Sequence, residues 1–192
     1  ISPVTLPDGS QVSTDDGPRA GTTYEKISQL KPVFRPNGTV TAGNACPLND
    51  GAAAVIVMSD EKAKELGLTP LARIVATGVS GLSPEIMGLG PIEATRKALA
   101  KAGMTIDDID LYEINEAFAV QVLGSARELG MDLDKLNVSG GAIALGHPFG
   151  MTGARITATL LNNLQTHDKT FGLETMCVGG GQGMAMIIER LS

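Results

Sequence analysis

One histidine of this sequence lies in a stretch whose composition would hold an imidazole in a fixed place. His147 stands inside Gly140–Arg155, which contains five glycines, and Pro148 follows it directly. Glycine allows positive φ angles and close approach of the backbone, and a following proline keeps a residue extended. An imidazole presented in this way can act as a general base near neutral pH. The alternative is a surface histidine in a turn that leads into a helix.

A cysteine with a glycine-rich turn behind it forms the second candidate group. Cys177 ends an apolar run, and Val178 and three glycines beginning at Gly179 follow it. Backbone N–H groups in such a turn can point at an oxygen that becomes negative during a reaction, and a thiol can transfer protons. The competing interpretation is a buried structural cysteine.

The third candidate is Asn115, in the stretch NEAFA where a predicted strand passes into a helix. Its amide could hold a water or a substrate carbonyl at the strand-end face that receives His147 and Cys177. Without other information, a helix N-cap is the simpler role for an asparagine at this place.

Composition excludes several classes of function. The net charge is −6 and only 3% of residues are aromatic, so no surface suits nucleic acid. The longest apolar runs are too short to cross a bilayer. Two distant cysteines and two histidines form no metal cluster, and we expect no metal and reduced thiols, as in a cytoplasmic protein. The GGGQG stretch leads into a strand rather than a helix, which argues against a dinucleotide site.

The elements that must position these groups alternate along the chain. We expect helices after the Ser59 cap, from Pro91 to Gly103, from about Phe118 to Gly130, and after the glycine-rich turn. Between them the apolar runs predict five strands, and we expect an α/β fold with a mixed five-stranded sheet. These strands are Ala52–Met58, Leu71–Val79, Asp110–Ile114, Gly172–Val178 and Gly183–Glu189.

Three strings in this order, NEAFA, GGAIALGHPFGMTGAR and CVGGGQGMA, resemble the C-terminal signatures of the thiolase family. TVTAGNACPLNDGAAAV and IMGLGP also resemble family segments, so the resemblance extends from about Thr14 onward. It implies a thiolase-like layered α-β-α half. The sequence of these segments is similar to that of degradative 3-ketoacyl-CoA thiolases and acetyl-CoA acetyltransferases of actinobacterial type, some of which act on steroid side-chain CoA esters.

The resemblance implies a role for each candidate. His147 would activate the nucleophile and help to bind the enolate oxygen, with Asn115 holding a water there. Cys177 would be the acid and base, and the Gly179 N–H would serve a second oxyanion hole. Coenzyme A would be a substrate rather than a cofactor.

Four further residues match CoA-binding positions of the family. Arg19 would lie beside the adenine, and Met87 and Phe118 near the pantetheine. Cys46 stands where many members have serine, and this departure weakens any hydrogen bond there because a thiol is a poor donor.

No sequence here resembles the motif of the nucleophilic cysteine, which thiolases carry in their N-terminal half. The first residue is Ile1 rather than methionine, and we expect a piece of a longer polypeptide. Residues 1–40 would be the end of the loop domain and a connection, and residues 41–192 the C-terminal domain. The expected partners are the N-terminal half and a second or further copies in a homodimer or homotetramer. The fragment alone should be inactive.

The resulting hypothesis is half of an enzyme of lipid degradation that cleaves 3-ketoacyl-CoA with CoA, or runs the reverse condensation, through an acyl-cysteine. A ketoacyl synthase is an alternative from the same superfamily, although it needs no cysteine base and Cys177 argues against it. A non-catalytic module that binds CoA or lipid is the alternative from another class, because the chain lacks the nucleophile.

Overall fold

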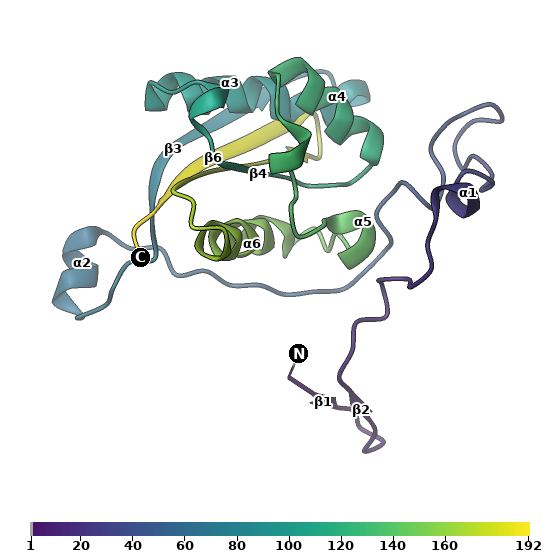
Figure 1. Ribbon diagram of the computed structural model, residues 1–192, viewed down its shortest axis with the longest axis horizontal. Helices are drawn as coiled ribbons and strands as arrows, with labels where there is room; N and C mark the ends of the chain where they lie inside the picture. Colours follow the sequence, from purple (N-terminus) through teal and green to yellow (C-terminus); the bar gives the residue numbers. More distant parts are fainter. Residues whose placement is uncertain (1) are drawn as a thin grey trace.

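A mixed four-stranded sheet is the framework of the computed structural model, which describes residues 2–192 (Figure 1). The strand order is β3 (Ala72–Gly81), β6 (Gln182–Arg190), β5 (Phe171–Val178) and β4 (Leu111–Ile114). β6 pairs antiparallel with both neighbours, whereas β5 and β4 run parallel. The expected α/β class, the mixed sheet and the terminal hairpin are confirmed.

Helices cover the two faces of this sheet. α3 (Gly90–Ala102) and α4 (Ala119–Leu129) lie on one face and α6 (Thr152–Thr166) on the other (Figure 1). Gly103 and Gly130 end α3 and α4 in the left-handed region, at φ 66° and 69°, as the sequence predicts. The larger core cluster packs α3 and α4 on the sheet, and a smaller one packs α6 on it.

The remaining elements are short. They are β1 (Val4–Thr5), β2 (Gln11–Val12), α1 (Tyr24–Ile27), α2 (Asp60–Glu65), the 3₁₀ helices η1 (Pro84–Leu89), η2 (Ile106–Asp108) and η3 (Leu133–Lys135), and α5 (Ala142–Leu145). The Ser59 hydroxyl caps α2 by accepting from the Lys62 N–H, as expected.

The expected strand Ala52–Met58 does not form, and the sheet therefore has four strands instead of five. Its side chains are exposed, Ile56 at 86%, and none of its backbone joins the sheet. An apolar run becomes a strand only where another strand pairs with its backbone. The described part of the chain offers this segment no such partner.

The N-terminal residues 2–58 extend away from the layered core but return to it at specific points (Figure 1). Ala45 and Phe118 form an isolated antiparallel bridge, and the Cys46 N–H donates to the Ala117 carbonyl at 3.0 Å. A Cβ on Gly51 would lie 2.7 Å from Pro148. The segment thus touches the loops on both sides of the predicted site.

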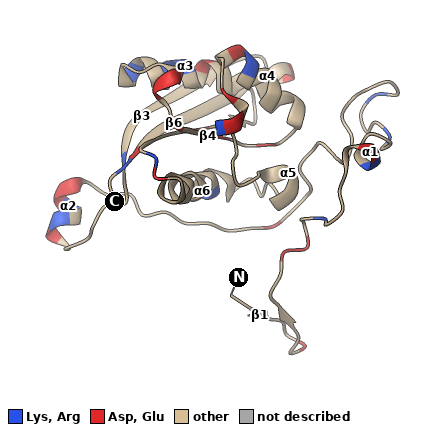
Figure 2. Cartoon of the chain, in the orientation of Figure 1, with Lys and Arg blue, Asp and Glu red and all other residues tan. Residues whose placement is uncertain are grey.

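Charged side chains are spread unevenly over the elements. Figure 2 shows Lys, Arg, Asp and Glu on α2, α3 and α4, whereas α6 carries almost none. Within residues 2–192, no helix has the length and apolarity needed to cross a membrane.

Candidate active site

The carboxyl ends of the parallel strands β4 and β5 bring two of the candidates to one edge of the sheet. Asn115 follows β4 directly, and its N–H donates to the Thr175 carbonyl of β5 at 3.0 Å. Cys177 lies two residues further along β5, and Gly179 comes just after that strand. Open α/β sheets bind their ligands at this edge.

The N-cap interpretation of Asn115 is wrong. α4 begins at Ala119, and its N-cap residue is Phe118. The Asn115 side chain is fully buried and turned toward the neighbouring glycine-rich loop instead.

His147 reaches the same place from the loop between α5 and α6. Gly146 at φ 101° breaks α5, and α6 begins at Thr152. The His147 Nε2 lies 3.2 Å from the Asn115 Nδ2, and the Nδ1 lies 2.6 Å from the Thr152 Oγ1. The glycine-rich turn therefore aims the imidazole at Asn115, 32 residues earlier in the chain.

The surroundings of His147 favour its neutral form. Burial lowers the pKa of the imidazole below its ordinary value, and the positive charge of Arg155 lowers it further. A neutral imidazole can accept a proton, which a general base must do.

Cys177 is a buried free thiol, 6% exposed. Burial raises its pKa, and the neighbouring Cys46 adds to the rise. Cys177 therefore keeps its proton at neutral pH and could donate it. The structural interpretation of this cysteine predicts the same burial.

Three of the CoA-binding candidates, Cys46, Phe118 and Met87, lie around residues 115–118, which link β4 to α4 and which we call the Asn115 loop. The Cys46 backbone pairs with Ala117, and the Phe118 ring meets Phe34 edge to face with centroids 5.9 Å apart. Met87 belongs to η1, which packs on α4. The Cys46 thiol has a pKa raised by burial.

Arg19 lies apart from these residues, in the exposed N-terminal segment. The segment approaches the core two residues earlier, where a Cβ on Gly17 would lie 2.5 Å from the Ala144 carbonyl oxygen of α5.

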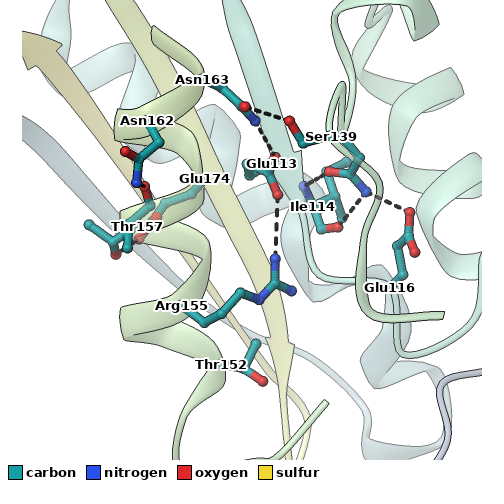
Figure 3. A network of polar contacts seen from close by, with 12 residues as sticks. Glu113, Ile114, Glu116, Ser139, Thr152, Arg155, Thr157, Asn162, Asn163 and Glu174 are labelled. Carbon is teal, nitrogen blue, oxygen red and sulfur yellow. Dashed lines mark hydrogen bonds and ion pairs between the residues drawn. The ribbon is translucent and has the colours of Figure 1, made fainter. Parts of the chain in front are cut away.

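Sequence reasoning missed a polar clamp that joins the Asn115 loop to α5. The Asn137 side chain bonds both backbone groups of Ile114, and its Nδ2 also donates to Glu116 at 2.9 Å (Figure 3). Glu116 in turn accepts from the Ile143 N–H at 3.1 Å. Asn137 has φ 47°, in the left-handed region that asparagine adopts more readily than other non-glycine residues, and its local side-chain bonds are compatible with this conformation.

A second polar cluster, also missed, lies between α6 and the sheet (Figure 3). The Glu113 carboxylate lies 3.8 Å from the Arg155 guanidinium and accepts from Asn163 at 3.3 Å. Glu174, beside Glu113 on the next strand, accepts from Thr157 at 2.9 Å. Burial raises the pKa of Glu113 to about 7 and that of Glu174 to about 8. Glutamates inside apolar strands were the signal that could have revealed this cluster.

Within the described residues, no group of three or more His, Cys, Asp or Glu side chains could hold a metal ion. The arrangement offers acid, base and hydrogen-bond donors instead.

Comparison with known proteins gives a consistent result. The family described as thiolase, C-terminal domain, matches residues 68–190, and that described as thiolase, N-terminal domain, matches residues 1–61. Acetyl-CoA acetyltransferase of Thiocystis violacea is 54% identical over 195 residues, covering 100% of this chain and 50% of the relative. The Escherichia coli acetyl-CoA acetyltransferase is 56% identical over 180 residues, covering 94% and 46%.

Solved structures agree with this match. The crystal structure of Bacillus anthracis acetyl-CoA acetyltransferase superposes with a TM-score of 0.94 at 52% identity, covering 100% of this chain and 49% of the other. Human mitochondrial 3-ketoacyl-CoA thiolase in complex with CoA gives 0.90 at 47% identity, covering 98% and 48%. The chain spans about half the length of the curated relatives it matches.

Proposed function

We propose, from the premise that this chain belongs to the thiolase family, that it is the C-terminal half of an acyl-CoA acyltransferase. That enzyme would cleave a 3-ketoacyl-CoA with CoA, or condense two acyl-CoA molecules in reverse. The observation that carries the proposal is the 3.2 Å contact between His147 and Asn115 at the strand edge that also holds Cys177.

In the cleavage direction, a cysteine of the N-terminal half attacks the 3-keto carbon after His147 Nε2 takes its proton. The bond between C2 and C3 then breaks, and its electron pair forms the enolate of acetyl-CoA. Hydrogen bonds from the His147 and Asn115 region stabilise the enolate oxygen. The Cys177 thiol gives its proton to C2. The thiol of an incoming CoA then gives its proton to the Cys177 thiolate and takes the acyl group from the nucleophile, whose sulfur regains the proton held by His147.

The charge states support these roles. Burial keeps the proton on the Cys177 thiol, as a proton donor requires, and keeps His147 neutral, as a base requires. The Gly179 N–H, just past the end of β5, would bind the oxygen of the acyl-cysteine.

CoA would lie along the surface made by Met87, Phe118 and Cys46, with Arg19 near its adenine. The crystal structure of human mitochondrial 3-ketoacyl-CoA thiolase in complex with CoA supports CoA as a ligand of this fold. We expect the whole enzyme to be a homodimer or homotetramer.

The names of the relatives, acetyl-CoA acetyltransferase and 3-ketoacyl-CoA thiolase, refer to acetyl-CoA and 3-ketoacyl-CoA. Acetoacetyl-CoA is therefore the first substrate to test. A degradative role on longer chains or steroid side-chain esters of CoA is the narrower form of the proposal. It predicts a higher kcat/KM for those esters than for acetoacetyl-CoA.

The test uses a fusion protein. The half of the Thiocystis violacea enzyme that has no match in this chain is placed before residue 1 of this chain. We call the product the reconstituted protein. It should cleave acetoacetyl-CoA with CoA, whereas the 192-residue chain alone should show no turnover. A folded reconstituted protein without turnover would contradict the proposal. If that protein still bound CoA in calorimetry, the non-catalytic module would be favoured instead.

A second experiment separates proton transfer at Cys177 from a structural role. Cys177→Ala in the reconstituted protein should still accept an acetyl group from acetyl-CoA, seen by intact mass. It should no longer exchange the α-protons of acetyl-CoA with deuterated solvent. A variant that exchanges protons at the normal rate would return Cys177 to the structural interpretation.

A further inference from the structure

The Thr152 hydroxyl is a fully buried group that lies against the His147 ring. The Oγ1 lies 2.6 Å from the His147 Nδ1 and donates to the Pro148 carbonyl at 3.0 Å. The same carbonyl accepts from the backbone N–H groups of Met151 and Thr152, at 2.9 and 3.1 Å. The hydroxyl is therefore held in one position by the first turn of α6.

The partners of the two ring nitrogens indicate the tautomer of His147. A hydroxyl has one proton, and the Thr152 hydroxyl donates it to the Pro148 carbonyl, so the Thr152 oxygen is left as an acceptor for His147 Nδ1–H. At the other end, the Asn115 amide turns its Nδ2 to the His147 Nε2, and an amide nitrogen only donates. This arrangement favours the proton on Nδ1 and a bare Nε2.

We propose that Thr152 is a positioning residue that fixes the tautomer of His147, so that Nε2 is the basic nitrogen presented at the sheet edge. This inference rests on the proposed function for its catalytic consequence. A histidine held in the wrong tautomer cannot take a proton from a nucleophile on that side.

A simple helix-start role is the competing explanation of the Thr152 hydroxyl. Thr157, one turn further along α6, makes the same bond to the carbonyl four residues back, at 2.8 Å to Gly153, without a histidine nearby. Thr157→Val is the control, because it removes an equivalent backbone bond from the same helix, together with the Thr157 bond to Glu174. Phe149 packs on the His147 ring, with centroids 5.0 Å apart, and should hold the ring in place in each variant.

The kinetic test measures acylation of the reconstituted protein by acetyl-CoA against pH. Thr152→Val should lower the plateau by roughly 10- to 100-fold, whereas Thr152→Ser should restore it. Thr152→Val should also move the acid limb to lower pH, because the imidazolium loses its Nδ1–H acceptor and the pKa of His147 falls further. Arg155 of α6, the charged side chain among the described residues that acts on this ring, is unchanged. Thr157→Val should leave the limb in place.

A spectroscopic test needs no turnover. The chain has two histidines, and His167→Gln assigns the second one in nitrogen-15 spectra of the ring nitrogens of the 192-residue chain. His147 should show a protonated Nδ1 and a bare Nε2, and Thr152→Val should shift the proton toward Nε2. A protonated Nε2 in the unsubstituted chain at neutral pH would overturn the inference.

The outcomes of the kinetic test are also distinct. An inactive, folded reconstituted protein contradicts the proposed function, and the spectra then decide the tautomer by themselves. An active protein in which Thr152→Val leaves plateau and limb unchanged, or in which Thr157→Val reproduces its effects, contradicts the role of Thr152.

Discussion

The two faces of the sheet are covered by helices of different character. On one face, α3 and α4 turn charges to the solvent, and Arg96 bridges Glu93 and Glu128. On the other face, α6 has one charged residue in fifteen, Arg155, whose side chain is 14% exposed and points at Glu113 (Figures 2 and 3). Water suits the outside of the first layer, whereas α6 carries Thr, Asn and Gln besides its apolar face and lacks the charges that α3 and α4 turn to the solvent.

The segment that runs beside α6 also distinguishes this face of the sheet from the other. Residues after Leu48, itself 99% exposed, run past the start of α6 at Gly51 and continue to α2 as an unpaired apolar stretch (Figure 1). Exposed apolar side chains on this side of the molecule belong to that stretch, whereas α6 itself is mostly buried or half-buried. Thr152 is the first residue of α6, and His147 lies in the loop just before it.

The largest difference between the layers should be kinetic. His147→Ala in the reconstituted protein should lower acylation and carbon–carbon cleavage by about 10²- to 10⁴-fold, because one imidazole activates the nucleophile in the first and helps to bind the enolate oxygen in the second. Lys97→Ala, which removes a solvent-side bond from α3 to the Val79 carbonyl, should leave both rates unchanged. If both variants lowered the two rates equally, the difference between the faces of the sheet would not be related to catalysis.

Ion pairs should separate the layers next. Arg155→Met leaves the buried Glu113 carboxyl without its cation, which raises its pKa further, so the carboxyl takes up a proton and the loss of unfolding free energy should be about 1–2 kcal/mol at pH 8. Arg96→Met on α3 removes exposed pairs that water and salt already screen, and it should cost less unfolding free energy than Arg155→Met. Urea unfolding of the reconstituted protein measures both.

A matched double variant tests the reason given for this difference. Adding Glu113→Gln to Arg155→Met removes the carboxyl that must take up a proton and should recover most of the loss. Failure to recover would show that Arg155 stabilises by packing rather than by charge.

Helix ends were predictable from the sequence because their signals are local. Pro91 with Gly103, Gly130 and the Ser59 cap each specify an end through the conformation of a few residues. The strand Ala52–Met58 was not predictable in the same way. Its apolar pattern predicted a buried strand, and this prediction was wrong, because no strand among the described residues pairs with the segment and pairing is a non-local property.

The site was predictable in its residue types and only partly in its contacts. Glycines around His147 and behind Cys177 gave a local reason to expect function, and the structure brings His147 to Asn115. The Thr152, Asn137 and Glu116 bonds depend on how loops far apart in sequence meet, so spacing alone could not reveal them. The roles of the site residues stay predictions.

The pH dependence of stability should come from the α6 side as well. The pKa of Glu174 is raised to about 8 in the folded protein, above that of an unfolded glutamate. The unfolded state therefore loses this proton first as pH rises, so the folded state binds more protons, and unfolding free energy should fall between about pH 5 and pH 8. The slope for one proton is at most about 1.4 kcal/mol per pH unit.

Glu174→Gln should flatten that slope, because it removes the titrating carboxyl. Urea unfolding at several pH values measures the effect. A slope unchanged by Glu174→Gln would place the titrating group elsewhere, Glu113 being the next candidate with its pKa of about 7.

The smallest effect should be found in the unpaired stretch, and it distinguishes a missing partner from a weak strand. Ile56→Ser in the 192-residue chain should change unfolding free energy by no more than ~0.5 kcal/mol, because the side chain is already in water. Ile187→Ser on β6, fully buried in the core, should cost about 2–5 kcal/mol in the same chain. In the reconstituted protein, Ile56→Ser should cost about 1.5–3 kcal/mol, because the added half supplies the burial that the stretch lacks here. An Ile56→Ser cost that stays near zero in the reconstituted protein would show that the added half does not bury Ala52–Met58, and that the two halves do not meet along this stretch.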